Sequence, residues 1–336
     1  MKASEVATSL KWLMLANQPA HIIGEPGVGK TSIVHQVSAE VGRDVIYSRL
    51  GEMESVDLRG LPIMDTKKGT TRWLRPDEFP GKDCKPTTWF FDEWSQGLPS
   101  VQSVAGRILN ERRLGEYVLP DQVYVCAASN RAKDRASVNR MPAQVADRFF
   151  WLSLEPDVGD WCKWAFAHGV ATEVVAYIRW QEKALSEFDP TKDVSPTCRS
   201  WENVSDALKT IQKRKLTIPQ AIEERVYAGK VGDGRACEFM GFLQVFRKLP
   251  DPAAMLMNPD KCELPSDKET ATLAAVCLGL SRKANDTNFG RVVTIANRLP
   301  AEFGALMVIM ATGRDKELCS TRAFIEYADQ HQELLV

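Results

Sequence analysis

Eight consecutive residues near the amino terminus have the types and spacing that bind phosphate groups. The segment from Gly24 to Thr31 is Gly-Glu-Pro-Gly-Val-Gly-Lys-Thr. Its small residues let successive backbone N–H groups converge on phosphate oxygens at the positively polarised start of a helix. Lys30 would then contact the β- and γ-phosphates of ATP, and the hydroxyl of Thr31 would contact Mg²⁺. The residues predicted to bind the nucleotide are Gly24, Glu25, Pro26, Gly27, Val28, Gly29, Lys30, Thr31 and Ser32.

Two adjacent carboxylates follow a β-branched and aromatic run, Thr87-Thr-Trp-Phe-Phe. Such a run predicts a buried strand. At the carboxyl end of a parallel strand beside the phosphate-binding loop, Asp92 would hold Mg²⁺ through its water shell and Glu93 would polarise the attacking water. Thr31 and Asp92 are therefore the predicted metal-site residues, and Glu93 is a predicted catalytic residue. The simpler interpretation is an unremarkable strand end.

An asparagine follows a second apolar run. Val123 to Ala128 predicts another strand, and Asn130 comes just after it. Beside the carboxylates, its amide could orient the water near the γ-phosphate. Taken alone, Asn130 also fits an ordinary turn.

The elements that must position these residues alternate between two periodicities. Helical spacing is found over 4–16, after the phosphate-binding loop and over 99–110, whereas short apolar runs at 21–23, 44–49, 87–92 and 123–128 predict strands. The segment 142–153 predicts a short helix that leads into another buried strand, with Arg148 at the junction. This alternation predicts an α/β domain with a parallel sheet. Two short strands at 60–64 and 70–74 predict a hairpin with Lys67, Lys68 and Arg72 at or near its tip, where a solvated turn is the competing interpretation.

Helical periodicity dominates from Glu155 onward. Helices are predicted over 157–168, 172–188, 199–214 and 219–227, and later over 236–248, 267–282, 287–299, 302–310 and 321–331. The glycine-rich segment 229–234 predicts a flexible joint. We therefore divide the chain into an α/β nucleotide-binding domain (1–154), a helical lid (155–228) and a helical extension (229–336). Trp, Met and Phe in the helical part are expected in the core, not in a binding platform.

Composition excludes several classes of function. The 336 residues carry 43 basic and 44 acidic side chains, so no global field recruits nucleic acid or a membrane. The eight cysteines are scattered, without the spacing of a metal site or a disulfide framework. We find neither the apolar core of a signal peptide nor an apolar run of about 18 residues, which predicts a cytoplasmic protein with no membrane contact.

The order of these motifs resembles that of the AAA+ ATPases, and within them the MoxR branch. Gly24 to Thr31 matches the Walker A motif, Trp89 to Glu93 the Walker B motif and Asn130 the sensor 1 position. Asp147-Arg148-Phe149 resembles the element that carries the family's arginine finger, and Ser195-Pro-Thr-Cys-Arg199 resembles the lid element that carries sensor 2. The resemblance implies that Arg148 and Arg199 are catalytic. It spans roughly residues 4–215, and the chain departs from it at Trp94-Ser95-Gln96 and in the two extra residues Thr197 and Cys198.

The resemblance implies an α/β P-loop AAA+ domain followed by an all-α lid and additional helices. It also implies a homo-oligomeric ring, expected to be a hexamer, that hydrolyses ATP with Mg²⁺ to remodel or activate a protein client. A partner with a von Willebrand factor A domain is implied by the family alone. In such a ring Arg148 would reach the γ-phosphate bound by a neighbouring copy.

Two alternatives stay open. The motor could act on nucleic acid through basic hairpins that carry Lys67, Lys68, Arg72, Arg112 and Arg113. The chain could also be a nucleotide-gated interaction protein or a P-loop kinase. A kinase would not need Asn130, Arg148 and Arg199 together, and a switch would not need Glu93.

Overall fold

The computed structural model describes residues 1–114, 116–134, 139–248 and 252–334. The chain divides into two compact units. The first consists of Met1–Asp157 with Asp189–Thr191, and the second of Val158–Phe188 with Lys192–Val336. Each unit is described by itself below.

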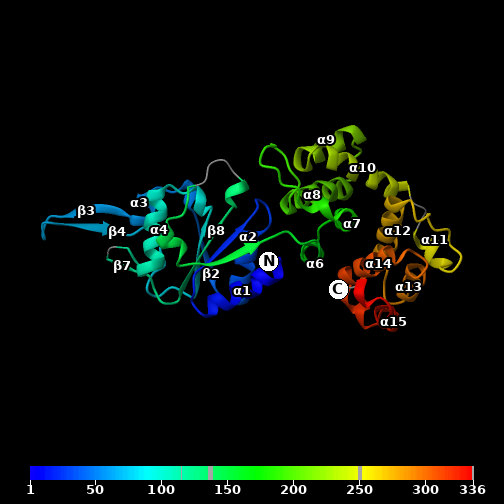
Figure 1. The fold of residues 1–336 in the computed structure, drawn as a ribbon, viewed down its shortest axis with the longest axis horizontal. Helices are drawn as coiled ribbons and strands as arrows, with labels where there is room; N and C mark the ends of the chain where they lie inside the picture. The colour runs from blue at the N-terminus through cyan, green and yellow to red at the C-terminus, as the bar shows by residue number, and fades with distance from the viewer. Residues whose placement is uncertain (115, 135–138, 249–251, 335–336) are drawn as a thin grey trace. The chain divides into compact units, whose positions relative to one another are not determined.

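A five-stranded sheet forms the centre of the first unit (Figure 1). Its strands lie in the order β2-β5-β8-β1-β9, and every neighbouring pair is parallel. The predicted α/β parallel-sheet fold is thus confirmed. Because the strands are parallel, the residues that follow β1, β5 and β8 share one edge of the sheet. The strand bounds are β1 Ala20–Gly24, β2 Asp44–Arg49, β5 Thr87–Asp92, β8 Val123–Ser129 and β9 Phe150–Leu154.

Helices cover both faces of this sheet. On one face, α1 (Ala3–Leu15) and α2 (Lys30–Glu40) share a buried cluster with Phe90. On the other, α4 (Pro99–Glu111) and α5 (Ala143–Ala146) share a cluster with Trp89 and Phe91. Successive side chains of a strand point to opposite faces, and both faces of the sheet are covered, which explains why β5 is buried at every position and carries large apolar residues on both faces. The short helix α3 covers Ser55–Arg59.

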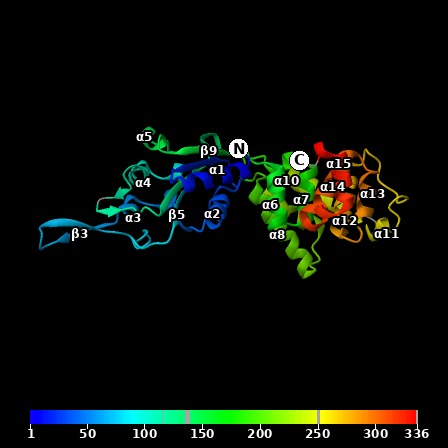
Figure 2. The same cartoon turned by 90° about the horizontal axis from the view of Figure 1, so that it is seen from below.

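Two β-hairpins extend from this sheet and its covering helices. The strands β3 (Leu61–Asp65) and β4 (Thr70–Leu74) pair antiparallel, with Leu61 opposite Leu74. This confirms the predicted hairpin. It extends away from the rest of the unit in both views (Figures 1 and 2), and most of its residues are exposed. A smaller hairpin pairs β6 (Arg113–Leu114) with β7 (Tyr117–Val118).

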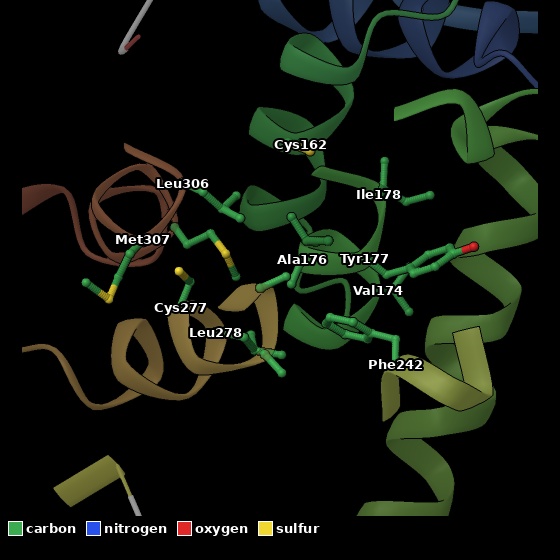
Figure 3. Packing of buried hydrophobic residues seen from close by; sticks show 14 of the residues in the cluster. Cys162, Val174, Ala176, Tyr177, Ile178, Phe242, Cys277, Leu278, Leu306 and Met307 are labelled. Atoms are coloured by element: carbon green, nitrogen blue, oxygen red, sulfur yellow. The ribbon is translucent and has the colours of Figure 1, made fainter. Parts of the chain in front are cut away.

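The second unit is helical and has one large buried cluster, part of which is shown in Figure 3. Trp161 and Trp201 are buried in it, as predicted for core residues. Tyr177 packs against Phe239 and Phe242, at centroid distances of 5.2 and 5.9 Å. The cluster therefore joins helices from both predicted helical segments, and the division at residue 228 stays a prediction.

Most helices of the second unit lie close to their predicted positions, whereas α11 was not predicted. They are α6 Val158–Ala167, α7 Thr172–Trp180, α8 Cys198–Arg214, α9 Gln220–Val231, α10 Asp233–Lys248, α11 Pro252–Met257, α12 Thr270–Lys283, α13 Phe289–Ala296, α14 Ala301–Arg314 and α15 Arg322–Gln330. None of the helices within the described ranges has both the length and the apolar character that a bilayer span requires.

Two local predictions in this unit need correction. The joint predicted over 229–234 is a break of one residue: α9 continues to Val231, α10 begins at Asp233, and Gly232 lies between them with φ 79°. Glycine adopts that left-handed conformation readily, so one residue suffices for the break. The helix predicted over 172–188 ends at Trp180, because Gln181 has the non-helical angles φ −118° and ψ 72°.

Candidate nucleotide-binding site

The phosphate-binding loop lies between β1 and α2. Gly27 and Gly29 have φ angles of 75° and 104°, which side chains rarely adopt. Gly24 allows a close approach to the edge strand, because a Cβ atom there would lie 2.7 Å from the carbonyl oxygen of Leu154. Helix α2 begins at Lys30, so the loop ends at the amino terminus of a helix. This backbone is the arrangement that favours anion binding.

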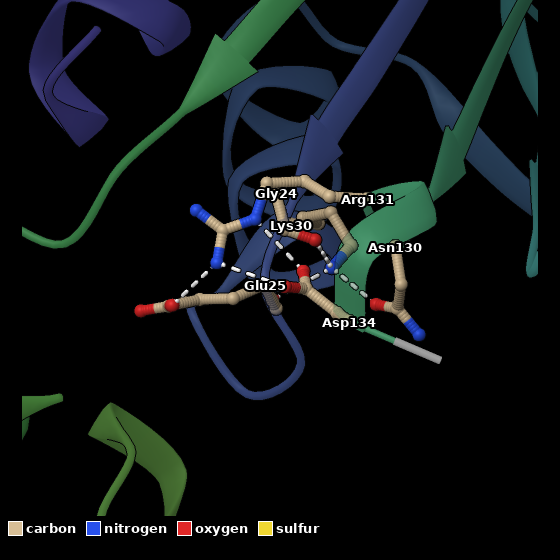
Figure 4. A network of polar contacts seen from close by, with 6 residues as sticks. All are labelled: Gly24, Glu25, Lys30, Asn130, Arg131 and Asp134. Carbon is tan, nitrogen blue, oxygen red and sulfur yellow. Dashed lines mark hydrogen bonds and ion pairs between the residues drawn. The ribbon is translucent and has the colours of Figure 1, made fainter. Parts of the chain in front are cut away.

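The ammonium group of Lys30 lies at the centre of the loop (Figure 4). It donates hydrogen bonds to the carbonyl oxygens of Gly24 and Glu25, at 3.0 and 2.9 Å, and to Oδ1 of Asn130 at 2.8 Å. Asn130 follows β8, the strand that pairs with both β1 and β5. The structure thus brings together Lys30 and Asn130, which lie 100 residues apart in the chain.

The Asp92 carboxylate accepts three hydrogen bonds. Thr31 Oγ1 and the Tyr47 hydroxyl each donate to Oδ2 at 2.9 Å, and the backbone N–H of Glu93 donates to Oδ1 at 2.8 Å. The Thr31 hydroxyl and the Asp92 carboxylate therefore place hard oxygen ligands side by side next to the loop. This donor set fits Mg²⁺, which is bound through one or two protein oxygens together with phosphate oxygens and waters.

Glu93 has an unusual backbone conformation. Its φ of 54° and ψ of 35° lie in the left-handed region, which costs about 1–2 kcal/mol for a residue other than glycine. The chain turns here from β5 into the 3₁₀ turn Trp94–Gln96. A Cβ atom on Gly51 would lie 3.3 Å from Glu93 Oε2, so the absence of a side chain at Gly51 leaves room for this carboxylate.

An ion-pair network beside Lys30 was not predicted from the sequence. Arg131 donates from Nη2 to Glu25 Oε2 at 2.7 Å and from Nε to Asp134 Oδ2 at 2.8 Å (Figure 4). The hydrogen bond to Asp134 is the main cause that raises the pKa of Arg131. Through Glu25, the network ties the segment after β8 to the loop. The signal in the sequence was the position of Arg131 directly after Asn130.

Tyr47 was also missed, because a tyrosine in a strand is usually interpreted as a packing residue. Burial is the main cause that raises its pKa, and the Asp92 charge raises it further against the opposing hydrogen bond from Arg49. Its hydroxyl therefore stays protonated at neutral pH and can donate to Asp92. The sequence carried no motif that marks this position.

His21 lies beneath the site on β1. Its Nε2 and the Ser129 hydroxyl are 2.7 Å apart, and its ring stacks on Trp151 with centroids 4.4 Å apart. Burial, together with the nearby Lys30 charge, lowers the pKa of His21 to about 3. The ring is therefore neutral at physiological pH and serves the packing of the sheet.

Arg148 lies near the amino ends of the strands, whereas the phosphate-binding loop follows the carboxyl end of β1. Arg148 is exposed and comes two residues before Phe150, which pairs with Ala20 at the amino end of β1. The loop instead begins at Gly24, four residues further along that strand. At about 3.3 Å per residue, the separation along the sheet is about 13 Å before the turn from Arg148 is counted. The structure does not bring Arg148 to the loop of its own subunit.

Arg199 belongs to the second unit. It is exposed and is the second residue of α8, whose N-cap Thr197 accepts a hydrogen bond from the Ser200 N–H at 3.1 Å. Thr197 and Cys198, the two residues that interrupt the motif, are thus the N-cap and first residue of this helix. The proposed role of Arg199 stays a prediction.

A protein-family model matches the part of the chain that contains this site. Residues 20–149 match the family model described as AAA domain (dynein-related subfamily). No curated protein matches the chain. Among solved structures, a proposed ATPase from Cytophaga hutchinsonii is 15% identical, with 99% of this chain and 89% of that chain covered and a TM-score of 0.35. A RuvB variant from Thermotoga maritima is 12% identical, with coverages of 80% and 79% and a TM-score of 0.42.

The matched segment contains the parts of the site described above. It includes the phosphate-binding loop, the strand that ends in Asp92 and the residues that follow β8. The strand order, the loop geometry and the family match together identify residues 20–149 as an AAA domain with a P-loop fold.

Proposed function

We propose that the chain is an ATP-hydrolysing, ring-forming AAA+ motor of the MoxR type that remodels or activates a protein client. One observation carries the proposal. The carboxyl ends of the strands bring together Lys30, Asp92, Glu93 and Asn130. Arg148 is exposed near the amino ends of the strands. In this proposal a single copy would bind ATP and activate water with its own groups, and a second copy would supply the arginine.

Each residue has a defined task in this proposal. Backbone N–H groups of the loop would bind phosphate oxygens, and Lys30 would exchange its present acceptors for the β- and γ-phosphates. Thr31 and Asp92 would hold Mg²⁺, which when bound neutralises phosphate charge. Glu93 would accept the proton of the attacking water while Asn130 orients that water. Arg148 of a neighbouring copy, and Arg199 of the helical unit, would stabilise charge on the γ-phosphate.

The β3–β4 hairpin supports a protein as the client. Its side chains Leu61, Ile63 and Met64 are exposed by 62%, 40% and 82%, so it offers apolar surface along with its basic tip. A von Willebrand factor A domain partner and a hexameric ring belong to the same proposal and rest on the family resemblance.

One feature of the smaller hairpin weakens the nucleic-acid alternative. Arg112 donates to the carbonyl oxygens of Pro120 and Val123, at 2.7 and 2.9 Å. Its guanidinium therefore stabilises the turn into β8 and does not project toward solvent as the basic-pore hypothesis requires. Lys67, Lys68, Arg72 and Arg113 are exposed and keep the alternative open. No contact among the described residues of the site favours a kinase or a nucleotide switch.

Two substitutions test the proposal. We expect Lys30→Ala to abolish ATP binding, and Glu93→Gln to bind ATP while its turnover falls by about 100-fold or more, because the general base is lost. Binding is measured with a fluorescent ATP analogue, and turnover by phosphate release. Lys11→Ala and Glu111→Gln change exposed residues of the same types and should behave as wild type.

The same turnover assay separates the alternatives. If single-stranded or duplex DNA stimulates phosphate release and the effect is lost at high salt, the substrate is nucleic acid. Full turnover by Glu93→Gln would refute the assignment of the general base.

A further inference from the structure

We infer that Tyr47 is a positioning residue for the metal-binding carboxylate of Asp92. The inference rests on the proposed Mg²⁺-dependent ATP binding and deepens it, because it adds a residue that none of the sequence motifs contains. Tyr47 lies on β2, the edge strand next to β5, and Asp92 is the last residue of β5.

The hydrogen bonds around Asp92 leave one direction for a metal-bound water. A carboxylate has about four lone-pair sites, two on each oxygen. Oδ2 accepts from Thr31 and Tyr47, and Oδ1 accepts from the Glu93 N–H. Among the residues that the structure describes, no donor occupies the second site on Oδ1, so this site is left for water of the metal shell. The three donors come from α2, β2 and the turn after β5, so they fix the plane of the carboxylate from three directions.

The direction of the Tyr47 hydroxyl proton follows from its two partners. Arg49 Nε lies 3.0 Å from the hydroxyl oxygen, and a guanidinium can only donate. An ionised carboxylate can only accept. The hydroxyl therefore accepts from Arg49 and donates to Asp92. Arg49 is itself held by Glu52 at 3.0 Å, so the proton of Tyr47 points toward the carboxylate.

The sheet places Tyr47 for this task. In the parallel pairing, Tyr47 lies opposite Phe90 and Arg49 lies opposite Asp92. Tyr47 and Arg49 are two residues apart in a strand and therefore point to the same face. The ring of Tyr47 packs near that of Phe90, with centroids 5.6 Å apart. Tyr47 matters because Thr31, the other donor to Oδ2, is itself the predicted Mg²⁺ ligand, so Thr31 alone cannot fix Asp92 independently of the metal.

The experiment compares nucleotide binding with and without the metal. Tyr47→Phe keeps the ring and removes only the donor. We expect it to raise the Mg²⁺ concentration needed for half-maximal binding of a fluorescent ATP analogue by about tenfold, as for other groups that orient metal ligands. Binding of the same analogue in EDTA should be unchanged. Arg49→Met, which removes the group that orients the hydroxyl, should shift the Mg²⁺ requirement in the same direction by less.

Tyr124→Phe is the matched control. It removes a buried hydroxyl near the amino end of β8, in the same sheet but away from the carboxyl edge. It should leave the Mg²⁺ requirement unchanged. A wild-type Mg²⁺ requirement in Tyr47→Phe would overturn the inference, and so would an equal loss of binding in EDTA, which would indicate general damage to the site. If the wild-type chain binds no ATP analogue at any Mg²⁺ concentration, the proposed function itself fails and the inference falls with it.

Discussion

Lys30 and Arg131 place two positive charges beside the loop, with different partners. Arg131 is paired with the carboxylates of Glu25 and Asp134, whose side chains are only 10% and 4% exposed. Lys30 donates to two backbone carbonyls and one amide oxygen, which are neutral acceptors. Exchanging neutral acceptors for phosphate oxygens strengthens a hydrogen bond, whereas breaking a nearly buried ion pair is costly. We therefore expect Lys30 to move to the phosphates and Arg131 to stay in place as a brace of the loop.

Burial of His21 makes the stability of the first unit depend on pH. The folded chain protonates this ring only near pH 3, whereas the unfolded chain does so near its usual pKa of 6.5. The contribution to the free energy of unfolding is complete above pH 6.5 and is lost as the pH falls toward 3. When the pH is lowered from 7.5 to 5.5, we expect the unfolding free energy of wild type to fall by about 1.4 kcal/mol more than that of His21→Gln. Urea unfolding at the two pH values measures this difference.

The substitution to glutamine suits this test because its amide nitrogen replaces Nε2 opposite the Ser129 hydroxyl but does not titrate. An equal loss in wild type and His21→Gln would show that other groups cause the pH dependence.

At the scale of elements, the contact between α4 and α5 determines where Arg148 is presented. A Cβ atom on Gly106 of α4 would lie 2.6 Å from Cγ2 of Val145 in α5. Arg148 follows α5 by two residues, and its backbone N–H bonds the carbonyl oxygen of Val145 at 3.1 Å. The missing side chain at Gly106 thus allows α5 to pack closely on α4 and places the proposed arginine finger at the amino end of β9.

Gly106→Ala tests this packing. Alanine is favoured over glycine within a helix by about 0.5–1 kcal/mol, but the overlap with Val145 costs about 1–3 kcal/mol. We expect a net loss of about 1 kcal/mol in the unfolding free energy of the first unit, measured with urea. Val145→Ala in the same chain should remove the overlap, so the second substitution should cost less in Gly106→Ala than in wild type.

Gly241 provides the matched control in α10, because a Cβ atom there would have no neighbour within 4 Å. Gly241→Ala should be neutral or stabilising. A stabilising Gly106→Ala would mean that α5 shifts without cost, and the account of how Arg148 is positioned would then be wrong.

At the scale of the whole molecule, the proposed mechanism leaves the hydrolytic site of a single copy incomplete. Lys30 and Glu93 lie at the carboxyl ends of the strands, whereas Arg148 lies at their amino ends. The side chain of Arg148 is too short to span the distance to the phosphate-binding loop of its own subunit. If Arg148 contributes to hydrolysis, the contribution must come from another copy, so activity and assembly are coupled.

The coupling predicts how ATP turnover depends on protein concentration. Turnover per subunit should rise steeply as rings assemble, because an arginine finger contributes about 10³- to 10⁵-fold in rate. Arg148→Ala should bind ATP normally, turn over slowly at every concentration, and inhibit wild type when the two are mixed. Phosphate release and sedimentation at matched concentrations are the measurements. Wild-type turnover by Arg148→Ala, or full turnover by a dilute monomer, would contradict the ring proposal.

The sequence by itself determined the phosphate-binding loop, the strand that ends in Asp92 with Glu93 directly after it, and the parallel α/β fold. These features follow from local rules, namely glycines where a turn needs positive φ, apolar runs where a strand is buried on both faces, and the shared edge of parallel strands. The position of Asn130 could be predicted for the same reason.

Only the tertiary structure decided the partners of these groups. Tyr47 and Asp92 are 45 residues apart in the chain, and Glu25 and Arg131 are 106 apart. Which side chains meet across such separations depends on strand order and register, and no local periodicity encodes them. The sequence likewise did not show which glycine of the segment 229–234 would break the helix, because Gly229 and Gly234 fit within the helices on either side of Gly232. Local chemistry thus fixed which groups the site contains, and the pairing of strands fixed which of them touch.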